Sequence, residues 1–293
     1  MLIQTCQLDI EQLTALDVLC DECKITDNNV VTMYRHLLGE NRHRPSSLMY
    51  FDEETKKMIG FLGAFFFLEG TCEIALMVAP DYRRQGIASQ LLKAIFPLTQ
   101  LEDIRHFVFS SPHGLNDNWF SKLRLQYQHS EFEMRRSGNK PISIQNNSVK
   151  IQPAKYVDIP TLCAIDEVCF PKDRMDGPTR VLRLLNDPVY CLFVVKKENE
   201  ILGKAHINWQ PNVTRISDLA IIPNAQGCGL GSALLTYCIH YALTKNKVDI
   251  VLDVETANKQ ALSLYTRHGF SITNAYDYWG INEFGLTGFL HRL

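Results

Sequence analysis

Apolar residues recur with two different spacings along the second half of the chain. Alternation of apolar and polar positions predicts strands over residues 149–152, 190–195, 201–209 and 215–222, and a short apolar run predicts a buried strand over 250–254. Helical spacing predicts helices after Asp158, over 231–244 and over 259–268, followed by two more strands between 270 and 293. Strands that alternate with helices in this way indicate an α/β domain with a mixed sheet.

The same order of motifs occurs twice. Segment 78–88 aligns with segment 221–231 without a gap, and Gly60 aligns with Gly203 at the same spacing. Self-similarity at a fixed spacing is the signature of a repeated structural unit. Residues 135–148 between the copies are polar and contain Gly and Pro, which is typical of a linker. The sequence therefore predicts two copies of one domain, over residues 1–147 and 148–293.

Composition and charge narrow the class of protein. Of 293 residues, 46% are hydrophobic and 21% are charged, which excludes a disordered chain. The net charge of −2 argues against nucleic-acid binding as the main activity. Nine cysteines without framework spacing, no secretory signal and no apolar run near the roughly 20 residues of a membrane span predict a cytoplasmic protein. Cys20 and Cys23 have no second ligand pair nearby, and the histidines show no metal-ligand spacing, so we expect no metal.

A glycine-containing loop joins a strand to a helix in the second copy. After Pro223 the loop reads Gln226-x-x-Gly229-x-Gly231, and a helix follows. Glycines let the backbone N–H groups converge, and the helix adds unpaired N–H groups and the positive end of its dipole, so the loop suits a diphosphate. The spacing is that of neither the P-loop nor the dinucleotide fingerprint. The alternative is an ordinary turn in which Gly only provides shape, but recurrence of the loop in the first copy favours a ligand.

A longer series of residues makes this pattern specific. It runs through Ile221-x-Pro223-x-x-Gln226-x-x-Gly229-x-Gly231, Leu252-Asp253-Val254, Asn258, Ala261, Leu264-Tyr265 and Gly269-Phe270. On these residues the chain resembles the GNAT superfamily of acetyl-CoA-dependent N-acetyltransferases, and its two copies are similar to tandem members of that superfamily. The second copy resembles the enzymes that acetylate ribosomal-protein N-termini. The resemblance implies an acyltransferase with two tandem GNAT-like α/β domains, each a mixed, mostly antiparallel sheet flanked by helices.

The resemblance also implies the ligands and where they bind. Acetyl-CoA would donate an acetyl group to a primary amine of a small molecule, peptide or protein. Backbone groups of Leu219, Ala220 and Ile221 would pair with the pantetheine arm, and Asn258 would lie beside it. The pyrophosphate would be held by Gln226, Gly227, Cys228, Gly229, Leu230, Gly231 and Ser232. The matching residues of the first copy are Val78, Arg83, Arg84, Gly86 and Ala88.

Three side chains of the second copy are candidates for the chemistry. Tyr265 occupies the position of the general acid in the superfamily, which protonates the departing thiolate. Asp253 matches the base of the resembled N-terminal acetyltransferases, and Asp218 on the preceding strand is its competitor. An aspartate within a strand is locally unfavourable, which favours a special role for each. The alternatives stay open: Tyr265 packs in an amphipathic helix, and each carboxylate pairs with Lys or Arg. Asn258 also suits a helix N-cap, which is compatible with a cofactor contact.

The first copy departs from the pattern where the proton donor belongs. Residues 116–123 contain no Tyr four residues before a Gly-Phe pair, and Phe120 or Lys122 falls at the place of Tyr265. We therefore expect the first copy to be a degenerate relative in which CoA binding is plausible and catalysis is not. The alternative function for the whole chain is a non-catalytic acyl-CoA sensor or interaction protein.

The resemblance places the entrance for the amine at segments 170–178 and 276–284 of the second copy. The second of these segments combines Tyr, Trp and Phe rings with two carboxylates, which suits a cationic amine. The alternative is that these strand-forming residues pack against the other copy.

Overall fold

The computed structural model describes residues 1–68, 70–102, 104–142, 149–170, 177–198 and 200–282, together with Gly285, Gly288 and Arg292. The chain packs into two compact units. The first unit holds Met1–Phe132, Glu255–Ala257 and Asn274–Leu293, and the second holds Glu133–Val254 and Asn258–Thr273. Both units therefore differ from the expected domains, because the end of each sequence copy packs with the other unit. The boundary between the copies after residue 147 stays a prediction.

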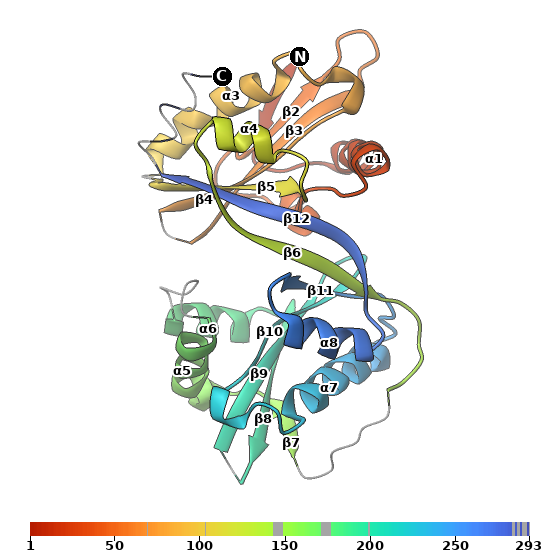
Figure 1. Ribbon diagram of the computed structural model, residues 1–293, viewed down its shortest axis with the longest axis vertical. Coiled ribbons are helices and arrows are strands. Elements are labelled where there is room, and N and C mark those ends of the chain that lie inside the picture. The colour runs from red at the N-terminus through yellow and green to blue at the C-terminus, as the bar shows by residue number, and fades with distance from the viewer. Residues whose placement is uncertain are drawn as a thin grey trace. The chain divides into compact units, whose positions relative to one another are not determined.

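The first unit is a sheet with helices packed on it (Figure 1). Its elements are β1 (Leu2–Thr5), α1 (Ile10–Asp27), α2 (Arg35–Leu38), β2 (Ser47–Phe51), β3 (Met58–Leu68), β4 (Thr71–Val78), α3 (Ile87–Leu101), β5 (His106–Pro112), α4 (Asp117–Lys122), the first part of β6 (Gln126–Arg136) and most of β12 (Ser271–Asn282). The strand order is β1-β2-β3-β4-β5-β12-β6. Neighbours from β1 to β4 are antiparallel, β4 and β5 are parallel, and β12 is antiparallel to β5. Strand β12, which lies near the end of the chain, thus completes the sheet of the first unit.

The second unit repeats this architecture. Its elements are β7 (Lys150–Pro153), α5 (Ile159–Cys169), α6 (Gly177–Asn186), β8 (Tyr190–Lys197), β9 (Glu200–Trp209), β10 (Thr214–Ile221), α7 (Leu230–Thr244), β11 (Ile250–Glu255) and α8 (Lys259–Arg267). The strand order is β6-β11-β10-β9-β8-β7, so the end of β6 occupies the place that β12 occupies in the first unit. The α/β fold with a mixed, mostly antiparallel sheet is confirmed. Of the two strands expected after residue 270, the described residues contain β12, which spans Ser271–Asn282, and most of the residues after it lie outside the described ranges.

Helices cover both faces of the second sheet. Leu192 and Val194 of β8 pack with Leu162 of α5 and Val181 of α6. Phe193 lies between them in sequence and therefore points to the other face, where its ring contacts Tyr237 and Tyr241 of α7. Figure 1 shows α5 and α6 on one side of β8–β10 and α7 on the other. This arrangement gives the sheet one face toward α5 and α6 and another toward α7.

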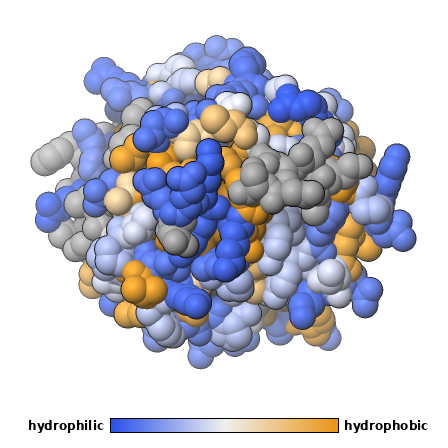
Figure 2. Space-filling model, turned by 90° about the horizontal axis from the view of Figure 1, so that it is seen from below, coloured by the Kyte–Doolittle hydropathy of each residue, from blue (hydrophilic) through white to orange (hydrophobic). Residues whose placement is uncertain are grey.

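The face of the molecule shown in Figure 2 is largely polar. Hydrophilic side chains cover most of the face in Figure 2, and hydrophobic ones form small groups between them. Over the described ranges, no helix has both the length and the apolar character that crossing a bilayer requires.

Candidate functional site

Two strands of the second unit diverge at the centre of the candidate site. The parallel pairing joins Thr214 and Arg215 of β10 to Ile250 and Val251 of β11, whereas β10 continues to Ile221 and β11 to Glu255. The register of β10 with β9 shifts between Ser217 and Ala220, where a bulge places Asp218 at φ 52°. Left-handed backbone at a residue other than Gly costs energy and is concentrated at functional sites. Leu219, Ala220 and Ile221 form the diverging end of β10, where a cofactor arm could pair.

The loop after β10 has the shape that the sequence predicts. Pro223–Ala225 form one 3₁₀ turn, Gly227 and Gly229 adopt φ 77° and 80°, and α7 begins at Leu230. The first N–H groups of a helix have no partner within the helix and attract anions. A Cβ added at Gly227 would meet nothing within 4 Å, so this loop faces open space. The backbone can therefore approach a phosphate closely.

In both units, side chains bind the last backbone carbonyl of the strand before the glycine loop, β4 in the first unit and β10 in the second. Gln226 Nε2 donates to the Ile221 carbonyl at 2.8 Å, and the Cys169 thiol approaches the same oxygen at 3.6 Å. In the first unit Arg83 Nε donates to the Val78 carbonyl at 3.1 Å, and the Cys23 thiol approaches it at 3.6 Å. The two loops are therefore structural counterparts.

The other residues expected to bind the pyrophosphate differ in their exposure and in their hydrogen bonds. Cys228 is an exposed thiol, whereas the Leu230 side chain is buried. The Ser232 hydroxyl lies 3.1 Å from His268 Nε2, so its hydrogen-bonding capacity is shared with that ring. A Cβ added at Gly231 would lie 3.7 Å from the Ile221 and Leu264 side chains, an ordinary contact. An alanine fits there, as Ala88 does at the matching place.

Helix α8 carries Asn258 and Tyr265. Asn258 Oδ1 accepts the Ala261 N–H at 3.0 Å, which confirms the expected N-cap, while its contact with a cofactor stays a prediction. Tyr265 is buried and its ring meets Phe270 edge-on with centroids 6.2 Å apart. Burial, together with the nearby Asp253 carboxylate, raises the pKa of Tyr265 to about 12. The hydroxyl therefore stays protonated at neutral pH and can donate a proton.

Asp253 and Asp218 both have basic partners. Arg215 forms a close ion pair with Asp253 and lies 3.4 Å from Glu133. Asp218 Oδ2 lies 2.8 Å from Arg180 Nη2 and 3.1 Å from His206 Nδ1. The ion pairs that the sequence left open are therefore present, and they do not by themselves decide which carboxylate acts as a base.

Sequence reasoning missed the groups around Asp218. Lys204, His206 and Asn208 alternate along β9 and are all buried on the face toward α5 and α6. Lys204 Nζ lies 2.5 Å from Asp166 Oδ1, and Arg180 lies 3.9 Å from Asp166 Oδ2. A period-two series of polar residues inside a strand was the signal that could have revealed this buried network.

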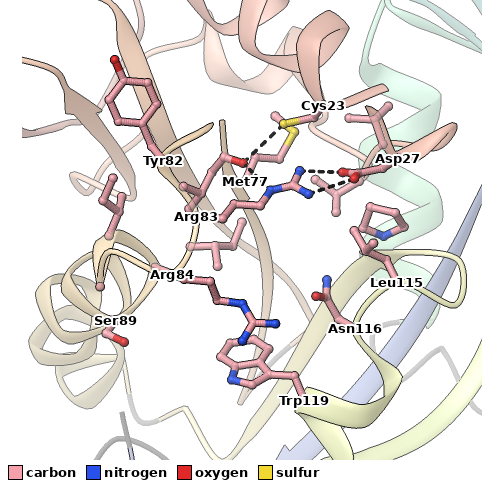
Figure 3. Close-up of a pocket in the computed structure, with 18 of the residues that line it drawn as sticks. Cys23, Asp27, Met77, Tyr82, Arg83, Arg84, Ser89, Leu115, Asn116 and Trp119 are labelled. Carbon is pink, nitrogen blue, oxygen red and sulfur yellow. Dashed lines mark hydrogen bonds and ion pairs between the residues drawn. The ribbon is translucent and has the colours of Figure 1, made fainter. Parts of the chain in front are cut away.

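The first unit contains a cavity of about 460 Å³ beside its glycine loop (Figure 3). All five expected residues line it: Val78, Arg83, Arg84, Gly86 and Ala88. Gly86 has φ 81°, and a Cβ added there would meet nothing within 4 Å.

Charged and aromatic side chains complete the wall of this cavity. The Arg83 guanidinium binds both carboxylate oxygens of Asp27, at 2.9 and 2.6 Å. Arg84 extends toward Trp119 in the close-up view, and Asn116 lies nearby (Figure 3). The cavity thus combines a phosphate-type loop with an additional cation, Arg84, at the place of Gly227.

Apolar residues replace the candidate catalytic groups in the first unit. The Leu125 N–H donates to the Phe120 carbonyl at 3.0 Å, just as the Phe270 N–H donates to Tyr265 at 3.1 Å, so Phe120 is the counterpart of Tyr265. The pairing of Thr71 with His106 and of Thr214 with Ile250 makes Ala75 and Phe109 the counterparts of Asp218 and Asp253. The first unit therefore lacks both candidate carboxylates as well as the expected proton donor.

The aromatic segment expected at the amine entrance has another role. Residues 276–282 pair with β5 inside the first unit, and Tyr276, Tyr278 and Trp279 are buried there. Tyr278 stacks on His129 at 4.6 Å, and burial raises the pKa of Tyr278 well above its ordinary value. Its assignment to an entrance of the second copy is therefore wrong for these residues, and the alternative of packing holds. Glu283, Phe284 and residues 171–176 lie outside the described residues.

Within the described ranges, no group of three or more His, Cys, Asp or Glu side chains could hold a metal ion.

Comparisons with known proteins agree with these features. The model of the Acetyltransferase (GNAT) family matches residues 14–111 and 159–270, one match in each sequence copy. A mycothiol acetyltransferase of Arthrobacter sp. (strain FB24) is 25% identical over 89% of this chain and 89% of its own length. One of Pseudarthrobacter chlorophenolicus is 28% identical over 69% of this chain and 67% of its own.

Solved structures show the same fold. A GCN5-related N-acetyltransferase from Sphaerobacter thermophilus has a TM-score of 0.73 at 13% identity and covers 96% of this chain and 95% of its own. A tandem GNAT protein from the clavulanic acid biosynthesis pathway has a TM-score of 0.67 at 11% identity, with 96% and 98% covered. The similarity to ribosomal-protein acetyltransferases stays a prediction, whereas the two-copy resemblance is confirmed: this chain is a tandem member of the GNAT family of acetyltransferases.

Proposed function

We propose that the chain transfers an acetyl group from acetyl-CoA to a primary amine of a small molecule, peptide or protein, with the chemistry in the second unit. GNAT acetyltransferases use acetyl-CoA, and the loop from Gln226 to Ser232 has the open backbone that a pyrophosphate needs. The observation that carries the proposal is Tyr265, a protonated hydroxyl beside Asp253 whose first-unit counterpart is Phe120. Of the two units, the second alone has candidate acid and base groups at these positions.

The side chains of the second unit would divide the work. Bound acetyl-CoA supplies an acetyl group activated as a thioester. Tyr265 would give its proton to the departing thiolate, because its raised pKa keeps the proton in place until a strong base develops. Burial of the ring, together with the negative charge of Asp253, would hold the hydroxyl in this state. A carboxylate, Asp253 or Asp218, would take the proton of the incoming ammonium.

The first unit supports a second, non-catalytic function. Its cavity has the loop, the strand end and the Arg84 cation for a CoA-type ligand, yet its counterparts of the three candidate catalytic groups are Ala75, Phe109 and Phe120. Acyl-CoA binding without transfer is therefore favoured for this unit. The names of the relatives, mycothiol acetyltransferases, favour a small-molecule amine as the acceptor.

A reducing compartment, the cytoplasm, is part of the proposal. All nine cysteines are free thiols, and Cys228 is exposed. Disulfide-free chains with this many thiols are typical of reducing compartments.

Thiol release from acetyl-CoA tests the transfer. The panel contains ethanolamine, glucosamine, an amino acid ester and a tripeptide with a free N-terminus. We expect turnover on at least one of these amines, with mass spectrometry showing the acetylated product. Tight CoA binding without turnover on any amine would support a sensor in place of an enzyme.

A further inference from the structure

A buried network of charged groups lies behind Asp218 in the second unit. It joins five secondary-structure elements on the face of the sheet toward α5 and α6. Its titratable and charged members are Asp166 of α5, Arg180 of α6, Tyr190 of β8, Lys204 and His206 of β9, and Asp218 of β10. The two cations Lys204 and Arg180 face the two carboxylates Asp166 and Asp218. The protonation of His206 then depends on its own surroundings.

The surroundings of His206 decide which ring nitrogen carries the proton. Nδ1 lies 3.1 Å from Asp218 Oδ2, and the side chain is only 1% exposed. Nε2 is buried and has no hydrogen-bond partner among the described residues. A proton on Nε2 would be a buried donor without a partner, which is costly, whereas a proton on Nδ1 is accepted by a carboxylate. Geometry thus favours the neutral tautomer with the proton on Nδ1.

Burial acts in the same direction. The pKa of His206 is lowered, first by burial, against the opposing effect of Asp218. Lys204 and Arg180 lower it further. The ring therefore stays neutral, and its donation to Asp218 does not change across the neutral pH range.

Asp218 occupies a position that suits contact with the reacting groups. It sits at φ 52° in the bulge of β10, immediately before the diverging end formed by Leu219–Ile221. Asp253 forms a close ion pair with Arg215, and its charge adds to burial in raising the pKa of Tyr265. Asp218 is ion-paired as well, with Arg180, but its place in the bulge beside the diverging strand end favours it as the base.

We propose that His206 is a positioning residue, which donates Nδ1–H to Asp218 and so fixes one carboxylate oxygen while the other takes a proton from the acceptor ammonium. The proposal deepens the acetyl transfer proposed above and rests on it. It assigns specificity for amines that arrive protonated, because a carboxylate both attracts and deprotonates them.

The protons and bonds balance. Asp218 takes the first proton from the ammonium, and the nitrogen then forms its bond to the acetyl carbon as the carbon–sulfur bond breaks. Sulfur receives the proton of Tyr265, and the second nitrogen proton restores the Tyr265 hydroxyl. The remaining proton, on Asp218, leaves to water, so one proton is released for each amide formed.

The tautomer can be tested without any acceptor. Full-length protein with ¹⁵N-labelled histidine is measured by long-range proton–nitrogen NMR, and His206 is assigned from the signal lost in His206→Asn. We expect a neutral ring with the proton on Nδ1 from pH 8 down to pH 5.5, and a loss of this tautomer preference in Asp218→Ala. A proton on Nε2, or protonation of the ring near its ordinary pKa of about 6.5, would overturn the proposal.

The positioning role is tested by kinetics with whichever amine of the panel gives the highest thiol release. His206→Leu removes the donor, whereas His206→Asn keeps an N–H near the place of Nδ1. We expect His206→Leu to move the acidic limb of kcat/KM for the amine about one to two pH units upward, because the carboxylate loses a donor that favours its charged form. KM for acetyl-CoA should not change, and His206→Asn should restore most of the profile.

Each outcome separates the two proposals. If the wild-type chain acetylates no amine and Tyr265→Phe changes nothing, the transfer proposal fails and the role of His206 fails with it. If the wild-type chain is active and His206→Leu lowers Tm without moving the acidic limb, His206 is merely structural and only the positioning role is overturned. A shifted limb that His206→Asn corrects supports it.

Discussion

Removing the Tyr265 hydroxyl should separate chemistry from stability. Tyr265→Phe takes away one oxygen from a ring that is 8% exposed, and the packing against Phe270 is kept. Because the ring and its contact with Phe270 are kept, the free energy of unfolding at pH 7 should change by less than about 0.5 kcal/mol. The general acid is lost, and kcat should fall about 100- to 10,000-fold.

The raised pKa of Tyr265 also predicts how the free energy of unfolding depends on pH. Below pH 10 both the folded and the unfolded chain keep the proton, so Tyr265 adds no pH dependence. Above pH 10 the unfolded chain loses the proton while the folded chain holds it to about pH 12, so stability falls as pH rises. From pH 7 to pH 11 the wild-type chain should lose about 1.4 kcal/mol relative to Tyr265→Phe, of which about 1 kcal/mol is lost between pH 10 and 11.

The assays are single-turnover thiol release and denaturant unfolding at pH 7, 10 and 11. Tyr237→Phe is the matched control, because it makes the same chemical change on α7, where the ring packs on Phe193. This control should leave turnover unchanged. Unchanged single-turnover rates in Tyr265→Phe would refute the assignment of the acid, and equal high-pH stability of the two chains would refute its raised pKa.

Three further changes test other parts of the structure. Gly229→Val and Gly86→Val place a branched side chain at nearly the same φ, 80° and 81°, so both should cost similar stability, but only Gly229→Val should abolish turnover; equal loss from both would contradict catalysis in the second unit. Arg83→Ala should lower the free energy of unfolding by about 1.5–3 kcal/mol in denaturant titrations, because it leaves the buried Asp27 carboxylate without its partner, and an unchanged value would show that the pair contributes nothing. Tyr278→Ala should lower stability by about 3–5 kcal/mol and leave KM for the amine unchanged; a raised KM with intact stability would return this residue to the amine entrance.

Much of the candidate site could be predicted from local patterns in the sequence. The glycines at 227 and 229, the cap at Asn258 and the helix that presents Tyr265 depend on a few neighbouring residues, and each was predicted where the structure has it. Such features follow from backbone sterics and from the unpaired N–H groups of a helix end, which act within one or two turns.

The surroundings of the carboxylates could not be read in the same way. Asp218 and Asp253 stood out as aspartates in strands, but their partners Arg180, His206 and Arg215 come from other elements. Which cation reaches which carboxylate depends on the register of β9 with β10 and on the packing of α6. These distances are set by the folded chain and have no counterpart in the spacing of residues.

The sequence by itself determined that two related α/β units exist, where their glycine loops lie, and that the first copy lacks the tyrosine of the second. Tertiary structure alone decided that β12 pairs with β5, that Phe120 is the counterpart of Tyr265, and that the rings at 276 and 278 belong to a buried strand. The physical reason is that alternation of apolar residues specifies a strand and its buried face, but the backbone hydrogen bonds that join it to a neighbour are the same for any partner. Because the two sheets are alike, the position beside β5 and the position beside β11 are equivalent for a strand. Only the packing of the whole chain determines that β12 occupies the first and β6 the second.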